Sequence, residues 1–219
     1  MIQEVIVWTS LICSIANIVP RLGTGTDTSD KVRGHVVAAA CQTVMMFWSI
    51  INVIYGMNIT AVNYFVMSYY IYDIGHLLMN AYAKNDHIFI VHHMGTIAII
   101  LYQEYFNMPY YYFYNMMYVL LEGSGVMLNI SGTAKTLVPY TKFSNMMMTT
   151  NMVTYGLTRV VLYPLVLLHL GYFITTENLS IYDIGVRIPP CLLLIALYIM
   201  SVKWYMVMTK NYIRLRITG

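Results

Sequence analysis

Seven apolar stretches of about 20 residues, joined by short polar segments, are the feature that most limits what this chain can fold into. Of its 219 residues, 59% are hydrophobic and only 10% are charged, whereas soluble domains carry about 25% charged residues. Backbone polar groups must be paired within each span in lipid, so such stretches fold as helices. The sequence therefore predicts an all-α polytopic membrane protein with about seven transmembrane helices. The expected spans are 2–19, 35–55, 61–83, 87–102, 110–130, 145–170 and 183–208.

The basic residues are unevenly distributed between the two sides of such a bundle. With seven spans, most fall on one side: Arg21, Lys31, Arg33, Lys84, Lys135, Lys142, Lys203, Lys210, Arg214 and Arg216. The other two, Arg159 and Arg187, lie within a span or at the opposite end of one. The positive-inside rule then predicts a luminal N-terminus and a cytosolic C-terminus. The net charge of +3 is too small to favour nucleic acid as a partner.

The third to sixth predicted spans contain ionisable side chains away from the span ends. They are Asp73 and His76, then His92 and His93, then Glu122, and finally Arg159. At ~1.5 Å of rise per residue, the histidines and Glu122 lie roughly 8–12 Å from the cytosolic edge. Ionisable groups are costly at membrane depth and by default mark a functional site that faces the bundle interior. We therefore predict that these side chains converge on one inner chamber.

Helical periodicity predicts which way these residues face. Tyr69, Asp73 and His76 share a face of their span, and Tyr118, Glu122 and Asn129 share a face of theirs. His92 faces the same side as Thr96, where a ligand approaches. His93 is turned by about 100° toward a neighbouring helix. The predicted substrate-binding residues are Thr96, Tyr69, Tyr118, Asn129, Arg159 and Arg33.

Structural roles are the alternative for several of these groups. A single histidine inside a membrane often serves only to hydrogen-bond two helices, and His35 and His169, near span ends, are interpreted in that way. Arg159 is an expected partner of Asp73 or Glu122, because an unpaired buried charge is costly. No close H-x-x-H or E-x-x-H spacing occurs, so neither a metal site nor a bound cofactor is predicted.

Five sequence blocks, in a fixed order, resemble a known family. They are RGH at 33–35, SYYIYD at 68–73, IVHHMGT at 90–96, LLEGSGVMLN at 120–129 and TRVVLYP at 158–164. Together they resemble the TLC (TRAM/Lag1/CLN8) domain family over residues 32–210. The resemblance implies six core helices, here spans 2–7, in a bundle around a lipid cavity. Residues 1–20 are then an N-terminal membrane anchor helix, and 211–219 a basic cytosolic tail.

The resemblance also implies a function. Ceramide synthases of this family use paired histidines to transfer a fatty acyl group from acyl-CoA to a sphingoid amine. This chain lacks their longer acidic motif and Hox-like insert, and it is more similar to the small TLC-domain proteins. By analogy, His92 acts as base or nucleophile, His93 or His76 assists, and Asp73 or Glu122 fixes the working tautomer.

Two functional hypotheses follow. The first is an acyl-CoA-dependent lipid acyltransferase, with acyl-CoA as co-substrate, in the endoplasmic reticulum or a related endomembrane. The second is a non-enzymatic protein that binds membrane lipid and regulates lipid composition or trafficking. A seven-helix receptor or rhodopsin is disfavoured, because no Asp-Arg-Tyr follows the third span and no N-P-x-x-Y closes the seventh.

Overall fold

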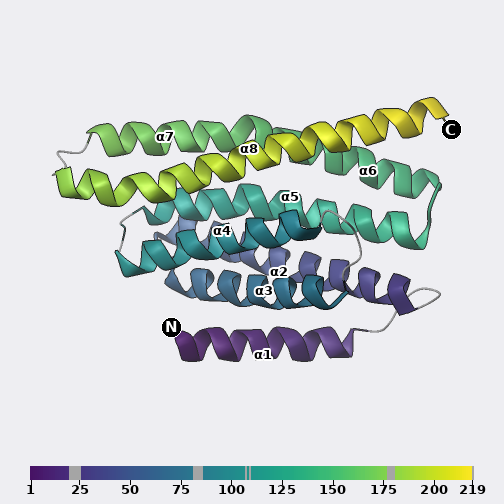
Figure 1. The fold of residues 1–219 in the computed structure, drawn as a ribbon, viewed down its shortest axis with the longest axis horizontal. Coiled ribbons are helices and arrows are strands. Elements are labelled where there is room, and N and C mark those ends of the chain that lie inside the picture. The colour runs from purple at the N-terminus through teal and green to yellow at the C-terminus, as the bar shows by residue number, and fades with distance from the viewer. Residues whose placement is uncertain (20–25, 81–85, 107, 109, 177–180, 219) are drawn as a thin grey trace.

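The structure, a computed structural model, describes residues 1–19, 26–80, 86–106, 108, 110–176 and 181–218. Within these residues the chain is almost entirely helical and contains no β-strand. The helices lie side by side in an elongated bundle (Figure 1). Their bounds are α1 Ile2–Ile18, α2 Thr26–Tyr55, α3 Thr60–Asn80, α4 Asp86–Tyr105, α5 Tyr111–Leu137, α6 Lys142–Tyr155, the π-helix η1 Gly156–Leu162, α7 Tyr163–Thr176 and α8 Ile181–Thr218.

The prediction of an all-α polytopic membrane protein is confirmed. Because α6, η1 and α7 follow one another without a break, the described residues form seven rods. Three rods are long and apolar enough to cross a membrane by themselves, over residues 28–55, 142–176 and 183–213, and α1 is a shorter apolar helix. Large apolar side chains such as Ile54, Leu78 and Leu168 are 65–70% exposed on the outside of the bundle, as a lipid-facing surface requires.

Several helices extend beyond the predicted spans. Helix α2 begins at Thr26, inside the segment expected to be a polar connector, and α5 includes Lys135. Helix α8 runs on to Thr218, so the predicted tail is largely a continuation of this helix. Hydropathy detects only the apolar part of a helix, whereas polar turns outside the lipid can remain helical through local pairs. One such pair joins Arg33 and Asp30, with Nη2 and Oδ1 3.0 Å apart.

Helix α5 lies at the centre of the bundle and packs against α2, α6, η1 and α7. Helix α1 lies at the outer edge, against α3 and α2 (Figure 1). An aromatic cluster holds it there: the Trp8 ring centroid lies 5.3 Å from that of Phe65 and 6.3 Å from that of Trp48. The remaining six rods, α2 to α8, therefore form the core, in agreement with the arrangement that the family resemblance implies.

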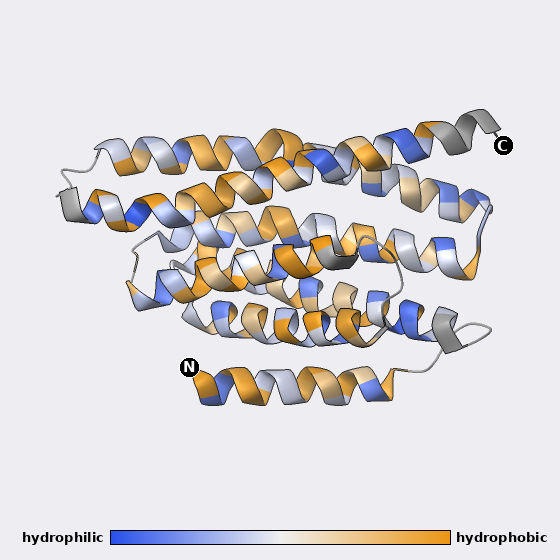
Figure 2. Ribbon diagram, in the orientation of Figure 1, coloured by the Kyte–Doolittle hydropathy of each residue, from blue (hydrophilic) through white to orange (hydrophobic). Residues whose placement is uncertain are grey.

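Hydrophilic residues gather at the end of the bundle where α2 begins, α5 ends and α6 begins (Figure 2). Lys31, Lys135 and Lys142 belong to these helix ends. Arg21 and Lys84 lie outside the described residues, as do the side chains of Arg214 and Arg216. Apolar residues predominate along the middle of the rods (Figure 2). Polar side chains such as those of Glu122, Ser124 and Arg159 are buried inside the bundle.

Candidate active site in an intramembrane cavity

A cavity of about 400 Å³ lies between α2, α3, α4, α5, the α6–η1 rod and α8. Along α5 its lining runs from Glu122 to Lys135, which is roughly 20 Å at the rise of an α-helix. Lys31 on α2 lines the same end as Lys135. Most of the predicted site residues line this cavity, namely Tyr69, Asp73, His76, His92, His93, Glu122, Asn129 and Arg159.

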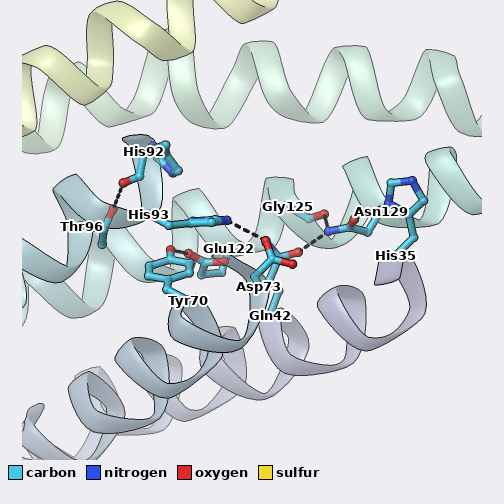
Figure 3. Close-up of polar contacts among 10 residues, drawn as sticks. All are labelled: His35, Gln42, Tyr70, Asp73, His92, His93, Thr96, Glu122, Gly125 and Asn129. Carbon is cyan, nitrogen blue, oxygen red and sulfur yellow. Dashed lines mark hydrogen bonds and ion pairs between the residues drawn. The ribbon is translucent and has the colours of Figure 1, made fainter. Parts of the chain in front are cut away.

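A histidine of α4 and an aspartate of α3 form a direct contact in the cavity wall. His93 Nε2 lies 2.8 Å from Asp73 Oδ2 (Figure 3). A carboxylate oxygen accepts, so Nε2 donates, and in the neutral imidazole Nδ1 then keeps its lone pair. Tyr70 stacks on the imidazole with ring centroids 4.4 Å apart, which restricts its rotation. His93 therefore faces a neighbouring helix, as its position in the helical turn predicts.

A buried carboxylate on α5 completes this part of the wall. Glu122 is 2% exposed, and its Oε1 accepts a hydrogen bond of 2.6 Å from the Tyr70 hydroxyl (Figure 3). Its second oxygen, Oε2, is buried and has no hydrogen-bond partner among the described residues. Tyr70 thus contacts both His93 and Glu122, so it connects α3, α4 and α5 around the cavity.

The adjacent imidazole, His92, makes no comparable contact. Its ring centroid lies 5.6 Å from that of His93 and 5.5 Å from that of Trp204 on α8. Its Nδ1 is buried without a hydrogen-bond partner in the described part of the chain. Because a buried polar atom is normally satisfied, His92 is suited to bind a group that enters the cavity.

A second polar wall joins α2 to α5. Asn129 Oδ1 lies 2.8 Å from His35 Nδ1, and Asn129 Nδ2 donates to Gln42 Oε1 over 2.8 Å (Figure 3). All three residues line the cavity. The sequence predicts only a structural role for His35, and Gln42 is not among the predicted site residues. Gln42 follows His35 by seven residues, or two helical turns, so the two share a face of α2, and this spacing could have identified Gln42.

His76 reaches the cavity because its neighbour on α2 is a glycine. Its ring lies parallel to that of Tyr72, with centroids 6.0 Å apart. A β-carbon added to Gly34 would lie 2.5 Å from His76 Nε2. Gly132 leaves room for His35 in the same way, since a β-carbon there would lie 2.9 Å from its Nε2. Side chains at these two positions would push the imidazoles out of place.

Arg159 forms no direct ion pair with Asp73 or Glu122 in the described part of the chain. Its Nε donates to Ser124 Oγ over 2.6 Å, and its Nη2 donates to the carbonyl oxygen of Leu121 over 2.7 Å. The hydroxyl and carbonyl on α5 satisfy part of the guanidinium without a second charge. Asp73 instead contacts His93 on α4, and Glu122 Oε1 accepts from Tyr70 on α3.

Three predicted substrate-binding residues do not line the cavity. Thr96 donates to the carbonyl oxygen of His92 in its own helix, over 3.1 Å. Arg33 pairs with Asp30 near the start of α2. Tyr118 donates to Asn63 Oδ1 over 2.8 Å. The shared helical face therefore did not distinguish cavity residues from those of the neighbouring polar contacts.

Tyr118→Phe tests this structural assignment of Tyr118. Removal of the hydroxyl leaves the buried Asn63 oxygen without its donor, so we expect a loss of stability of about 1 kcal/mol. Thermal unfolding in detergent measures the effect. Lipid binding in the cavity should be unchanged, and a variant of wild-type stability with impaired lipid binding would contradict the assignment.

Comparison with known protein families agrees with the sequence blocks described above. The family model of the TLC domain (TRAM/LAG1/CLN8) matches residues 34–210, from the first part of α2 to the last part of α8. A search of curated proteins gives no match. The matched region contains every residue that lines the cavity except Lys31, Asn211 and Tyr212. This integral membrane chain therefore belongs to the TLC-domain family.

Proposed function

We propose that this chain is a lipid acyltransferase that moves a fatty acyl group from acyl-CoA to an amine or hydroxyl of a membrane lipid. Membership of the TLC-domain family indicates a lipid-related role in a membrane. The observation that carries the finer proposal is the hydrogen bond between Asp73 and His93 in the cavity wall, beside His92. A carboxylate that orients an imidazole is the arrangement of a general base.

In this reaction the acceptor N–H or O–H attacks the carbonyl carbon of the thioester. His93 takes the acceptor proton on Nδ1, and Asp73 stabilises the imidazolium that forms. The new C–N or C–O bond forms as the C–S bond breaks, and the proton passes to the sulfur, so that CoA leaves as a thiol. The role of base moves from His92 to His93, because the orienting carboxylate contacts His93. His92 then binds the acceptor or returns the proton.

The entrance of the cavity supports acyl-CoA as the donor. Lys31 and Lys135 line its polar end, where they can attract phosphate groups. With the orientation predicted by the positive-inside rule, this end opens to the cytosol, and the cavity accepts acyl-CoA from there. We place the protein in the endoplasmic reticulum or a related endomembrane, with the N-terminus luminal.

Lipid profiling of cells that express the wild type or His92→Ala tests the proposal. The wild type should raise the amount of one class of acylated lipid, and His92→Ala should lose this effect while still inserting into the membrane. If the wild type changes no acylated lipid, acyl transfer is wrong. If His92→Ala raises the acylated lipid as much as the wild type does, His92 has no role in the transfer. Co-purified lipid without transfer would instead favour the non-enzymatic lipid-binding role.

A further inference from the structure

We infer that Arg159 binds the carbonyl oxygen of the acyl group and stabilises the negative charge that develops on it, an inference that rests on the proposed acyl-CoA substrate. Arg159 lines the cavity and is only 5% exposed. Its guanidinium carbon lies 4.9 Å from the centroid of the Tyr155 ring. The side chain is therefore fixed at the cavity wall. A positive charge buried there is costly unless it has a function or a binding partner.

The guanidinium retains hydrogen-bonding capacity after its contacts within the chain. Arginine has five N–H donors, and two nitrogens, Nε and Nη2, contact Ser124 and Leu121. No carboxylate of the described residues forms an ion pair with Arg159. A buried cation that lacks a direct counter-charge is costly unless a ligand oxygen completes its contacts. Nη1 is the nitrogen left for such an oxygen.

The π-helical backbone around Arg159 also supports a functional role for this residue. Arg159 lies in the middle of η1, a π-helical segment of seven residues within an otherwise α-helical rod. π-Helical turns are rare and are often found at functional sites. Helix α8 packs closely against the same segment, since a β-carbon on Gly156 would lie 2.9 Å from the Tyr205 hydroxyl oxygen. Packing against α8 thus supports the π-helical segment that contains Arg159.

The charge suits the reacting carbonyl group. When the acceptor attacks, the C=O π electrons move to oxygen, and a guanidinium N–H can bind the resulting oxyanion. As the C–S bond breaks, the electron pair returns to form the carbonyl of the product. Arg159 gains and loses no proton in this step. It acts together with His93, which lines the same cavity and handles the acceptor proton.

Binding of two unreactive acyl-CoA analogues to the full chain in lipid nanodiscs tests this inference. One is a ketone analogue, in which a methylene separates the sulfur from the carbonyl, and the other is an S-alkyl-CoA of the same chain length without a carbonyl. We expect the wild type to prefer the ketone by roughly 10- to 100-fold. Arg159→Met should abolish this preference by weakening only ketone binding, and Arg159→Lys should retain part of it.

The outcomes separate this inference from the proposed function. A folded Arg159→Met protein that keeps the preference, or that loses affinity for both analogues equally, would overturn the inference. If Arg159→Met does not fold, Arg159→Lys decides: a reduced preference supports the inference and an unchanged one overturns it. If the wild type transfers acyl groups but does not prefer the ketone analogue, the proposed function is retained and the role of Arg159 is wrong. If the wild type prefers the ketone analogue but transfers no acyl group, Arg159 still binds a carbonyl oxygen, and the proposed acyltransferase function is wrong.

Discussion

Asp73→Asn is expected to lower kcat for acyl transfer by about 10²- to 10⁴-fold. In the wild type the carboxylate accepts from His93 Nε2 over 2.8 Å, so Nδ1 is free to act as base. An amide at residue 73 can donate its own N–H to the imidazole, which favours the wrong tautomer, and it cannot stabilise an imidazolium. The measurement is kcat and KM for acyl-CoA with purified protein in nanodiscs. KM should change much less than kcat, because the pair acts on the proton and not on CoA.

The matched control for Asp73→Asn is Glu104→Gln. Glu104 is also a carboxylate on a core helix, but it accepts from Asn63 over 2.7 Å and does not line the cavity. Its replacement should leave kcat close to that of the wild type. Equal kcat values for Asp73→Asn and the wild type would rule out the Asp73–His93 pair as the acid–base unit.

Reversal of the charges at the cavity entrance is expected to have the next largest effect. In the double variant Lys31→Glu/Lys135→Glu, two carboxylates repel the phosphates of CoA, so KM for acyl-CoA should rise by roughly 10- to 100-fold with little change in kcat. Both lysines are exposed, so added salt should weaken acyl-CoA binding to the wild type and reduce the difference between the two proteins. Initial rates at increasing ionic strength measure this.

Lys142→Glu is the control for the entrance lysines. Lys142 begins α6 at the same end of the bundle but does not line the cavity. A general effect of surface charge would change KM equally in this variant, whereas direct binding of CoA phosphates predicts a much smaller change. If the double variant has the KM of the wild type, the donor does not enter between Lys31 and Lys135.

The sequence predicted the helices and the chamber because both follow from hydropathy and from the cost of burying charge. It predicted that His93 turns to a neighbouring helix, because the angle between successive residues is fixed in an α-helix. It did not predict the contacts of Arg159. Ser124 Oγ and the Leu121 carbonyl satisfy two of its nitrogens, and such neutral acceptors on another helix have no signature in composition or charge.

The face shared by Tyr118 and Glu122 shows a second limit of sequence reasoning. Both residues lie on α5 with helical spacing, and both are buried. Tyr118 contacts Asn63, whereas Glu122 contacts Tyr70 at the cavity. The difference depends on how far along α5 the cavity extends, which is set by the surrounding helices. Periodicity gives the direction of a side chain but not the depth at which open space begins.

The π-helical segment has a consequence for the register of its rod. A hydrogen bond from residue i to i+5 accommodates one residue more than an α-turn does, so helical-wheel phase is not continuous from α6 to α7. A wheel drawn over 142–176 as one α-helix would misassign the faces beyond Leu162 by about 100° for each such residue. Tyr163, the first residue of α7, is fully buried and donates to the Leu194 carbonyl oxygen over 3.3 Å, and its direction does not follow from a wheel continued from α6. Loss of one residue within Gly156–Leu162 would thus rotate α7 relative to α6 by about 100°.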